Sequence, residues 1–163
     1  MTLPHGAIEG IVKGVEPHEE DFVTEFRRMV IACGMMAKVN GWWDDSPTVL
    51  KNDFEFLLLC TDGDSATADL RKELSDRIDG LVPHYKAAKI ALIQSEASEC
   101  VEAIRKDLPS DHIDGPMEVE ELADIVIRIM DYCFYYNIPI GETIIKKFKY
   151  NASRPYRHGG AKL

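Results

Sequence analysis

The sequence has little of what marks a secreted, membrane-bound or zinc-stabilised protein. Its four cysteines lie far apart and form no CxxC pair, whereas structural zinc sites usually use closely spaced ligands. No stretch approaches the ~18 consecutive apolar residues of a membrane-spanning helix. The opening MTLPHGAIEGIVKG lacks the basic start and the apolar run of a signal peptide. We therefore expect a cytoplasmic protein with reduced cysteines and no membrane partner.

Two further absences narrow the fold and the chemistry. No segment alternates apolar and polar residues persistently, so the sequence does not indicate a β-sheet. No glycine-rich loop of the kind that holds phosphates is present. The chain is 45% hydrophobic and 29% charged, which suffices for a packed core. Its 163 residues fit one domain, so we expect residues 1–163 to form a single all-α domain.

The charge is acidic overall and unevenly distributed. The formal net charge of −9 disfavours electrostatic binding of a nucleic-acid polymer. Residues 96–131 contain 11 acidic and 3 basic residues, whereas residues 132–163 contain 1 acidic and 6 basic residues. An acidic segment is often only the solvated face of a helix, so the spacing of its carboxylates has to distinguish a surface from a site.

Apolar residues at spacings of three and four predict a bundle of helices. Gly80 and Pro83 are expected to separate the third helix from the fourth. We expect residues 1–17 to form an extended lead-in and the final segment, SRPYRHGGAKL, to be irregular. The predicted helices cover residues 19–39, 48–60, 66–79, 84–106, 117–136 and 141–151.

Two of these helices carry apolar stripes that we expect to face the core. Because the short helices expose apolar faces on several sides, we also expect a homo-oligomer, either a dimer or a tetramer, in which two copies complete one bundle. The stripes consist of Ile90, Ile93, Ala97, Cys100 and Ile104 on the first helix, and of Val119, Leu122, Val126, Ile129 and Cys133 on the second.

Four carboxylates border these stripes. Glu96 and Glu99 are three residues apart on the first helix, and Glu121 and Asp124 are three apart on the second, so each pair shares one helix face. Carboxylates on facing helices need compensation, which a divalent cation provides, and all-oxygen ligands suit Mg²⁺ or Mn²⁺. A solvated surface is the competing interpretation. A di-iron site is disfavoured because neither Glu96 nor Glu99 is followed by His three residues later.

The segments SEASECVEA, EELADIVIRIMD and KKFKYNASRPYRHGG, taken in order, resemble the MazG-like family of all-α nucleoside triphosphate pyrophosphohydrolases. The resemblance covers residues 84–160, and Ser95 stands where many members have a glutamate. It implies a MazG-like bundle, extended by N-terminal helices, that hydrolyses nucleoside triphosphates between the α and β phosphates. It also implies that Glu96, Glu99, Glu121 and Asp124 are catalytic residues that hold Mg²⁺, and that Lys147, Asn151 and Arg154 bind the triphosphate substrate.

Trp42 and Trp43 are the candidates for binding the base. Adjacent tryptophans in a polar turn can stack on a nucleobase, although one or both can equally cap the core. Two alternatives to the proposed reaction remain at this point. One is phosphoribosyl-ATP pyrophosphohydrolase, which shares the carboxylate helices, and the other is a helical scaffold or regulatory module without activity.

Overall fold

The structure is a computed structural model that describes residue 10, residues 13–59 and residues 65–154. The described part of the chain is helical and contains no strand, which confirms the all-α prediction. In chain order it comprises η1 (Glu16–His18), α2 (Glu19–Val39), α3 (Pro47–Leu59), α4 (Ser65–Lys106), α5 (Met117–Tyr135) and α6 (Ile140–Ala152).

The predicted lead-in is wrong in its described part. Residues 13–15 are helical and continue into the 3₁₀ turn of η1, which runs directly into α2. Pro17 lies in the first turn of η1, where its fixed φ angle favours a helix start and its missing N–H costs nothing. Residues 1–9, and the predicted irregular ending beyond residue 154, lie outside the described residues.

The predicted break at Gly80 and Pro83 is also wrong, because α4 continues through both as one helix of 42 residues. Pro83 removes one backbone hydrogen bond, but it faces solvent, where water can satisfy the freed carbonyl. Side chains on both sides of it are held by the preceding segment. Lys51 contacts Asp79 at 2.9 Å, and Tyr85 donates to Asp45 at 2.7 Å. Tertiary contacts therefore outweigh the local helix-breaking preference.

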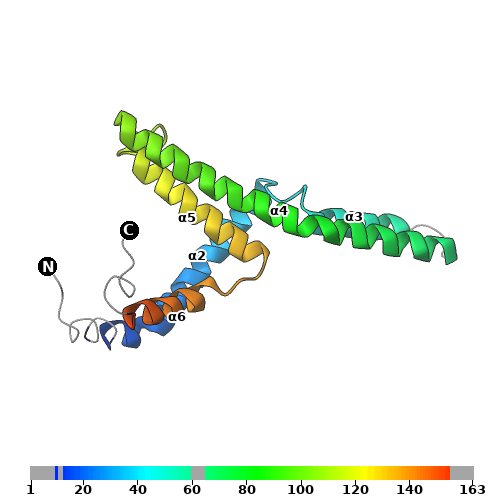
Figure 1. The fold of residues 1–163 in the computed structure, drawn as a ribbon, viewed down its shortest axis with the longest axis horizontal. Helices are drawn as coiled ribbons and strands as arrows, with labels where there is room; N and C mark the ends of the chain where they lie inside the picture. Colours follow the sequence, from blue (N-terminus) through cyan, green and yellow to red (C-terminus); the bar gives the residue numbers. More distant parts are fainter. Residues whose placement is uncertain (1–9, 11–12, 60–64, 155–163) are drawn as a thin grey trace.

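The long helix α4 organises the molecule, as Figure 1 shows. Helix α3 packs along its N-terminal half and α5 along its C-terminal half, while α2 crosses α5 and α6 lies beside the first part of α2. The α4–α5 pair is thus the part of the fold that brings the two predicted carboxylate motifs together. None of the described helices is both long enough and apolar enough to cross a membrane.

The core lies where α2 crosses α5. Val30 and Cys33 from α2 and Met130 and Cys133 from α5 form its buried cluster. The crossing is close because Gly34 lies directly against Phe134: a Cβ added at Gly34 would be 2.0 Å from Cγ of Phe134 and 2.5 Å from its Cβ. Small residues at such positions let helix backbones approach.

We expect Gly34→Ala to destabilise the protein by about 2 kcal/mol, because overpacked cores cost about 1–3 kcal/mol. The added methyl would meet the Cβ of Phe134 as well as its ring, so rotation of the ring cannot remove the clash. Thermal unfolding should show a decrease in Tm of about 4–8 °C. The matched control is Gly80→Ala, where a Cβ meets nothing within 4 Å; it should raise stability by about 0.5 kcal/mol. Equal effects of the two substitutions would contradict this packing.

The predicted apolar stripe of α4 is only partly buried. Cys100 is buried, but Ile90 is 49% exposed and Ile104 is 57% exposed. The buried face of α4 differs from the predicted stripe. In this part of the helix the buried residues are Glu96, Cys100 and Ala103, so the buried positions include those just before Ala97 and Ile104 of the stripe. The expectation that the whole stripe faces the core is therefore wrong, and it is also wrong for the stripe of α5, where Val119, Leu122 and Val126 are 49%, 53% and 46% exposed.

Candidate functional site

The site is built on the turn that joins α4 to α5. Asp107 adopts a left-handed conformation (φ 51°) and ends α4. The amide of Leu108 donates to Ala103, and the amide of Met117, the first residue of α5, donates to the carbonyl of Leu108. This tight reversal makes the two helices antiparallel and sets their motifs opposite each other.

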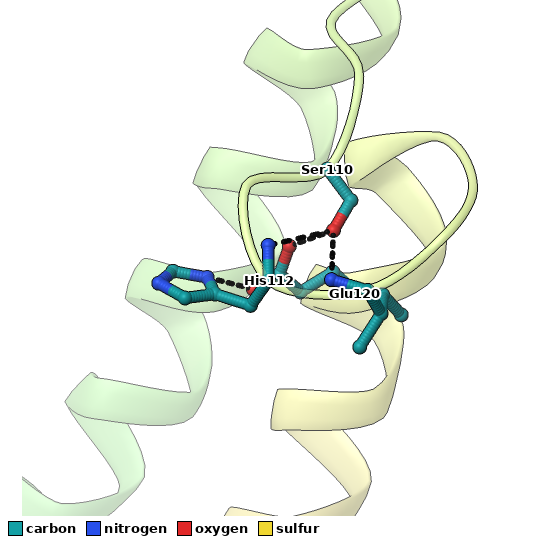
Figure 2. A network of polar contacts seen from close by, with 4 residues as sticks. Ser110, His112 and Glu120 are labelled. Atoms are coloured by element: carbon teal, nitrogen blue, oxygen red, sulfur yellow. Dashed lines mark hydrogen bonds and ion pairs between the residues drawn. The ribbon is translucent and has the colours of Figure 1, made fainter.

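A polar network braces this turn, as Figure 2 shows. The Ser110 hydroxyl donates to the Glu120 carboxylate and accepts the amide N–H groups of His112 and Ile113, the latter at 3.0 Å. Nδ1 of His112 lies 2.5 Å from Oε1 of Glu120. Hydrogen bonds from Ser110 and His112 lower the pKa of Glu120, and the contact with Glu120 raises the pKa of His112. The network therefore ties the loop to the first turns of α5, next to Glu121.

Three of the four predicted metal ligands meet between α4 and α5. Glu96, Glu99 and Glu121 each offer a carboxylate oxygen, and these oxygens all lie within 4.8 Å of one another. Glu96 is 6% exposed and Glu121 is 9% exposed, whereas Glu99 is open to solvent and accepts a hydrogen bond from Ser95 at 3.2 Å. Asp124, one turn further along α5, is half-buried and lies outside this group of three.

The electrostatics of the cluster favour a bound cation. Burial, contact with Glu96 and the charge of Glu99 raise the pKa of Glu121. Burial and the charge of Glu96 likewise raise the pKa of Asp124. Both groups thus resist ionisation in the protein alone, and a divalent ion would remove this penalty. Three adjacent carboxylates fit the oxygen-only coordination of Mg²⁺.

Arg128, a residue outside the predicted site, contacts the cluster directly. Its Nε donates to Oε1 of Glu96 at 2.5 Å, and its Nη2 forms an ion pair with the same oxygen. The two residues are 32 positions apart and on different helices, so no helical spacing indicates the pair. Arg128 supplies a positive charge at the edge of the acidic cluster.

The two tryptophans occupy different environments. Gly41, with φ 71°, reverses the chain after α2 and directs the Trp42–Trp43 segment back towards α5. Trp43 is 5% exposed; its ring stacks on Tyr135 at 3.9 Å, and its Nε1 donates to Oδ1 of Asp131 at 2.5 Å. Trp42 is 40% exposed. The core-capping alternative therefore describes Trp43, whereas the Trp42 side chain is accessible to solvent in the described part of the chain.

A cavity of about 330 Å³ is linked to the carboxylate cluster by Arg128, which lines the cavity and is bonded to Glu96. This volume is at the lower end of small-molecule sites. The wall combines aromatic rings with two cations and one buried carboxylate, and Arg128 belongs both to this wall and to the acidic cluster. The residues that line it are Trp42, Trp43, Lys89, Leu92, Arg128, Asp131 and Tyr132.

The predicted phosphate-binding residues lie on a different part of the structure from the carboxylate cluster. Lys147, Asn151 and Arg154 are on or just after α6, which packs on α2. Nζ of Lys147 lies 4.7 Å above the ring of Tyr150, and Arg154 lies 5.9 Å from the same ring. Figure 1 shows α6 along the first part of α2 and away from the α4–α5 turn. A single copy of the chain does not bring these three residues to the carboxylates.

Comparison with models of protein families, with curated proteins and with solved structures finds no match to this chain.

Proposed function

We propose that the protein is a Mg²⁺-dependent nucleoside triphosphate pyrophosphohydrolase of the MazG-like kind, with Mn²⁺ as a possible substitute ion. Water would attack the α phosphorus, giving the nucleoside monophosphate and pyrophosphate. The observation that carries the proposal is the group of three carboxylates within 4.8 Å, two of them buried, linked by Arg128 to a cavity with an exposed tryptophan and two cations.

In this proposal one set of residues would bind the metal ion and another set would bind the phosphates of the substrate. Glu96, Glu99 and Glu121 would hold the ion, with Asp124 as the further predicted ligand. When bound, Mg²⁺ neutralises phosphate charge and lowers the pKa of water. Arg128, now paired with Glu96, has several donors in a planar fork that can also bind a phosphate oxygen. Lys147, Asn151 and Arg154 remain predicted phosphate ligands on the strength of the resemblance.

We also propose that two copies pack through one apolar face of the α4–α5 pair. Consider the residues through which α4 and α5 touch each other. On each helix the next residue in the chain is rotated by about 100°, and because the two helices are antiparallel, these next residues of both helices lie on one and the same side of the pair. Ala97 and Val101 follow the buried Glu96 and Cys100, and Leu122 follows the buried Glu121. Large apolar residues exposed on this face of a single chain are Val101, Ile104, Val119, Leu122 and Val126. A second copy would cover them in a four-helix arrangement.

Added Mg²⁺ should stabilise the folded protein, and more so at neutral than at acidic pH. The raised pKa values of Glu121 and Asp124, above their ordinary 4.5 and 3.8, mean that their contribution to stability is present at low pH and is lost as the pH rises through the folded pKa. Mg²⁺ binds the ionised forms and reverses this loss. With the ion at ten times its Kd, the expected rise in Tm at pH 7.5 is about 3–6 °C, and it should be much smaller at pH 4.5.

The control for this measurement is Glu121→Gln, which keeps the shape of the side chain and removes the charge. The variant should show a flatter pH dependence of Tm without metal and a smaller response to Mg²⁺. The same Mg²⁺ response in the variant and in the natural protein would contradict ion binding at this cluster. No response with Mg²⁺ and nucleotide together would favour the non-catalytic scaffold.

A further inference from the structure

Asp131 is a buried carboxylate in the wall of the cavity, and only one of its oxygens is engaged. The residue is 7% exposed, and its Oδ1 accepts the Trp43 Nε1–H at 2.5 Å. Its Oδ2 receives no hydrogen bond from the residues that the structure describes. Oδ2 is not among the fully buried side-chain atoms that lack a partner in the described part of the chain, so it is open at the cavity wall and can accept a hydrogen bond from a ligand. The cavity therefore suits a ligand that brings hydrogen-bond donors to this position.

The two cations that line the same cavity are committed to other partners. Nζ of Lys89 donates to the carbonyl oxygen of Trp42 at 2.5 Å, and Arg128 is bonded to Glu96. Neither forms a hydrogen bond with Asp131 in the described part of the chain. An ammonium group has three donors, so Lys89 can hold Trp42 and still donate to a ligand in the cavity. The wall thus offers an acceptor, Asp131, together with a donor, Lys89.

Asp131 is also held rigidly. Trp43, its hydrogen-bond partner, stacks on Tyr135 with an angle of 9° between the rings, and the Tyr135 hydroxyl donates to the fully buried Ser46 at 2.5 Å. A carboxylate fixed in this way cannot turn to suit different ligands, which is the condition for selective recognition. Trp42, at the cavity wall and 40% exposed, provides an aromatic face for a ring beside it.

We propose that this cavity selects guanine among the nucleobases, an inference that rests on the proposed function because it names the substrate of the same site. Asp131 would accept the N1–H and the 2-amino group of guanine, one at the open Oδ2 and the other at Oδ1, which has a second lone pair beside the one that Trp43 uses. Lys89 would donate to O6, and Trp42 would stack on the ring. Guanine has two adjacent donors on one edge, followed by an acceptor. Adenine and cytosine place a ring nitrogen acceptor beside their amino group, and uracil places carbonyls on both sides of its N–H, so each sets a lone pair against the carboxylate.

The test measures binding of GMP, IMP, AMP, CMP and UMP by tryptophan fluorescence, in the presence of a metal chelator. Binding of a nucleoside monophosphate can be measured without a metal ion and without any reaction taking place. The expected result is that GMP binds roughly 10- to 100-fold more tightly than AMP, CMP or UMP. IMP keeps the N1–H and O6 but lacks the 2-amino group, so it should fall between GMP and the others.

The variant Asp131→Asn should keep the Trp43 hydrogen bond through its amide oxygen and lose the preference for GMP, while Glu102→Gln, an exposed change elsewhere on α4, should keep it. Equal binding of all monophosphates, no binding of GMP, or a GMP preference that survives Asp131→Asn would overturn the inference. The IMP comparison decides the matter even if Asp131→Asn fails to fold. If the protein binds GMP selectively but hydrolyses no triphosphate, the proposed function is refuted and the base selection is not. If it hydrolyses the four nucleoside triphosphates equally and binds the monophosphates without preference, the base selection is refuted and the proposed function is not.

Discussion

Replacing Glu99 by Gln should lower the Mg²⁺-dependent turnover of nucleoside triphosphates by at least about 100-fold. Glu99 is one of three carboxylates within 4.8 Å, and it is the exposed one, so its neutral replacement removes a ligand with little change to the packing. Removing one group that stabilises charge in the transition state commonly costs about 10²–10³ in rate, and we expect a similar loss where the removed group helps to hold the ion. Steady-state kinetics with saturating Mg²⁺ measure the effect.

The matched control is Glu102→Gln, three residues further along the same helix. Glu102 forms ion pairs with Arg105 and Lys106 on the exposed side of α4, at 3.4 and 2.6 Å. Its replacement should change the rate less than twofold, because surface ion pairs contribute ~0–1 kcal/mol and this one lies away from the cluster. If both variants retain full turnover, the assignment of the carboxylates is wrong. If both lose it equally, the loss is not specific to the cluster.

A second large effect is expected in the assembly of the protein. Leu122→Glu should convert the oligomer to a single chain at micromolar concentration, because it places a charge at the centre of the proposed interface. Leu122 is 53% exposed in one copy and lies between Val119 and Val126 on the same face of α5. Burying an unpaired carboxylate there would cost several kcal/mol in association. Analytical ultracentrifugation gives the mass directly.

Leu70→Glu is the control for this experiment. Leu70 is 49% exposed and belongs to the N-terminal half of α4, away from the proposed interface. The same chemical change there should leave the assembly state unaltered. A natural protein that sediments as a single chain would contradict the proposal, and so would an oligomer that survives Leu122→Glu or is lost equally with Leu70→Glu.

The sequence predicts most helix positions because turn residues and apolar spacing are local signals. The predicted helices at residues 19–39, 48–60, 117–136 and 141–151 agree with α2, α3, α5 and α6 to within one residue at each end. The error at Gly80 and Pro83 arises because their effect is also local, whereas the contacts that keep α4 continuous come from residues around Asp45 and Lys51. The tendency of Gly80 and Pro83 to break the helix is outweighed by these contacts with the preceding segment.

The site is predictable only as far as it follows helical spacing. The pairing of Glu96 and Glu99 with Glu121 follows from two motifs on consecutive helices, and the structure brings these three together. The contacts of Arg128 with Glu96 and of Trp43 with Asp131 join residues 32 and 88 positions apart. Such pairs depend on how the helices cross and rotate, and no local pattern specifies them.

The most direct test of the central claim is to identify the products of hydrolysis. The protein is incubated with each nucleoside triphosphate and Mg²⁺, and the products are separated by ion-exchange chromatography, with Glu99→Gln as the inactive control. Cleavage between the α and β phosphates should give one nucleoside monophosphate and one pyrophosphate per turnover, and both should be absent without metal. Release of orthophosphate with the nucleoside diphosphate, or no metal-dependent hydrolysis of any triphosphate, would contradict this claim.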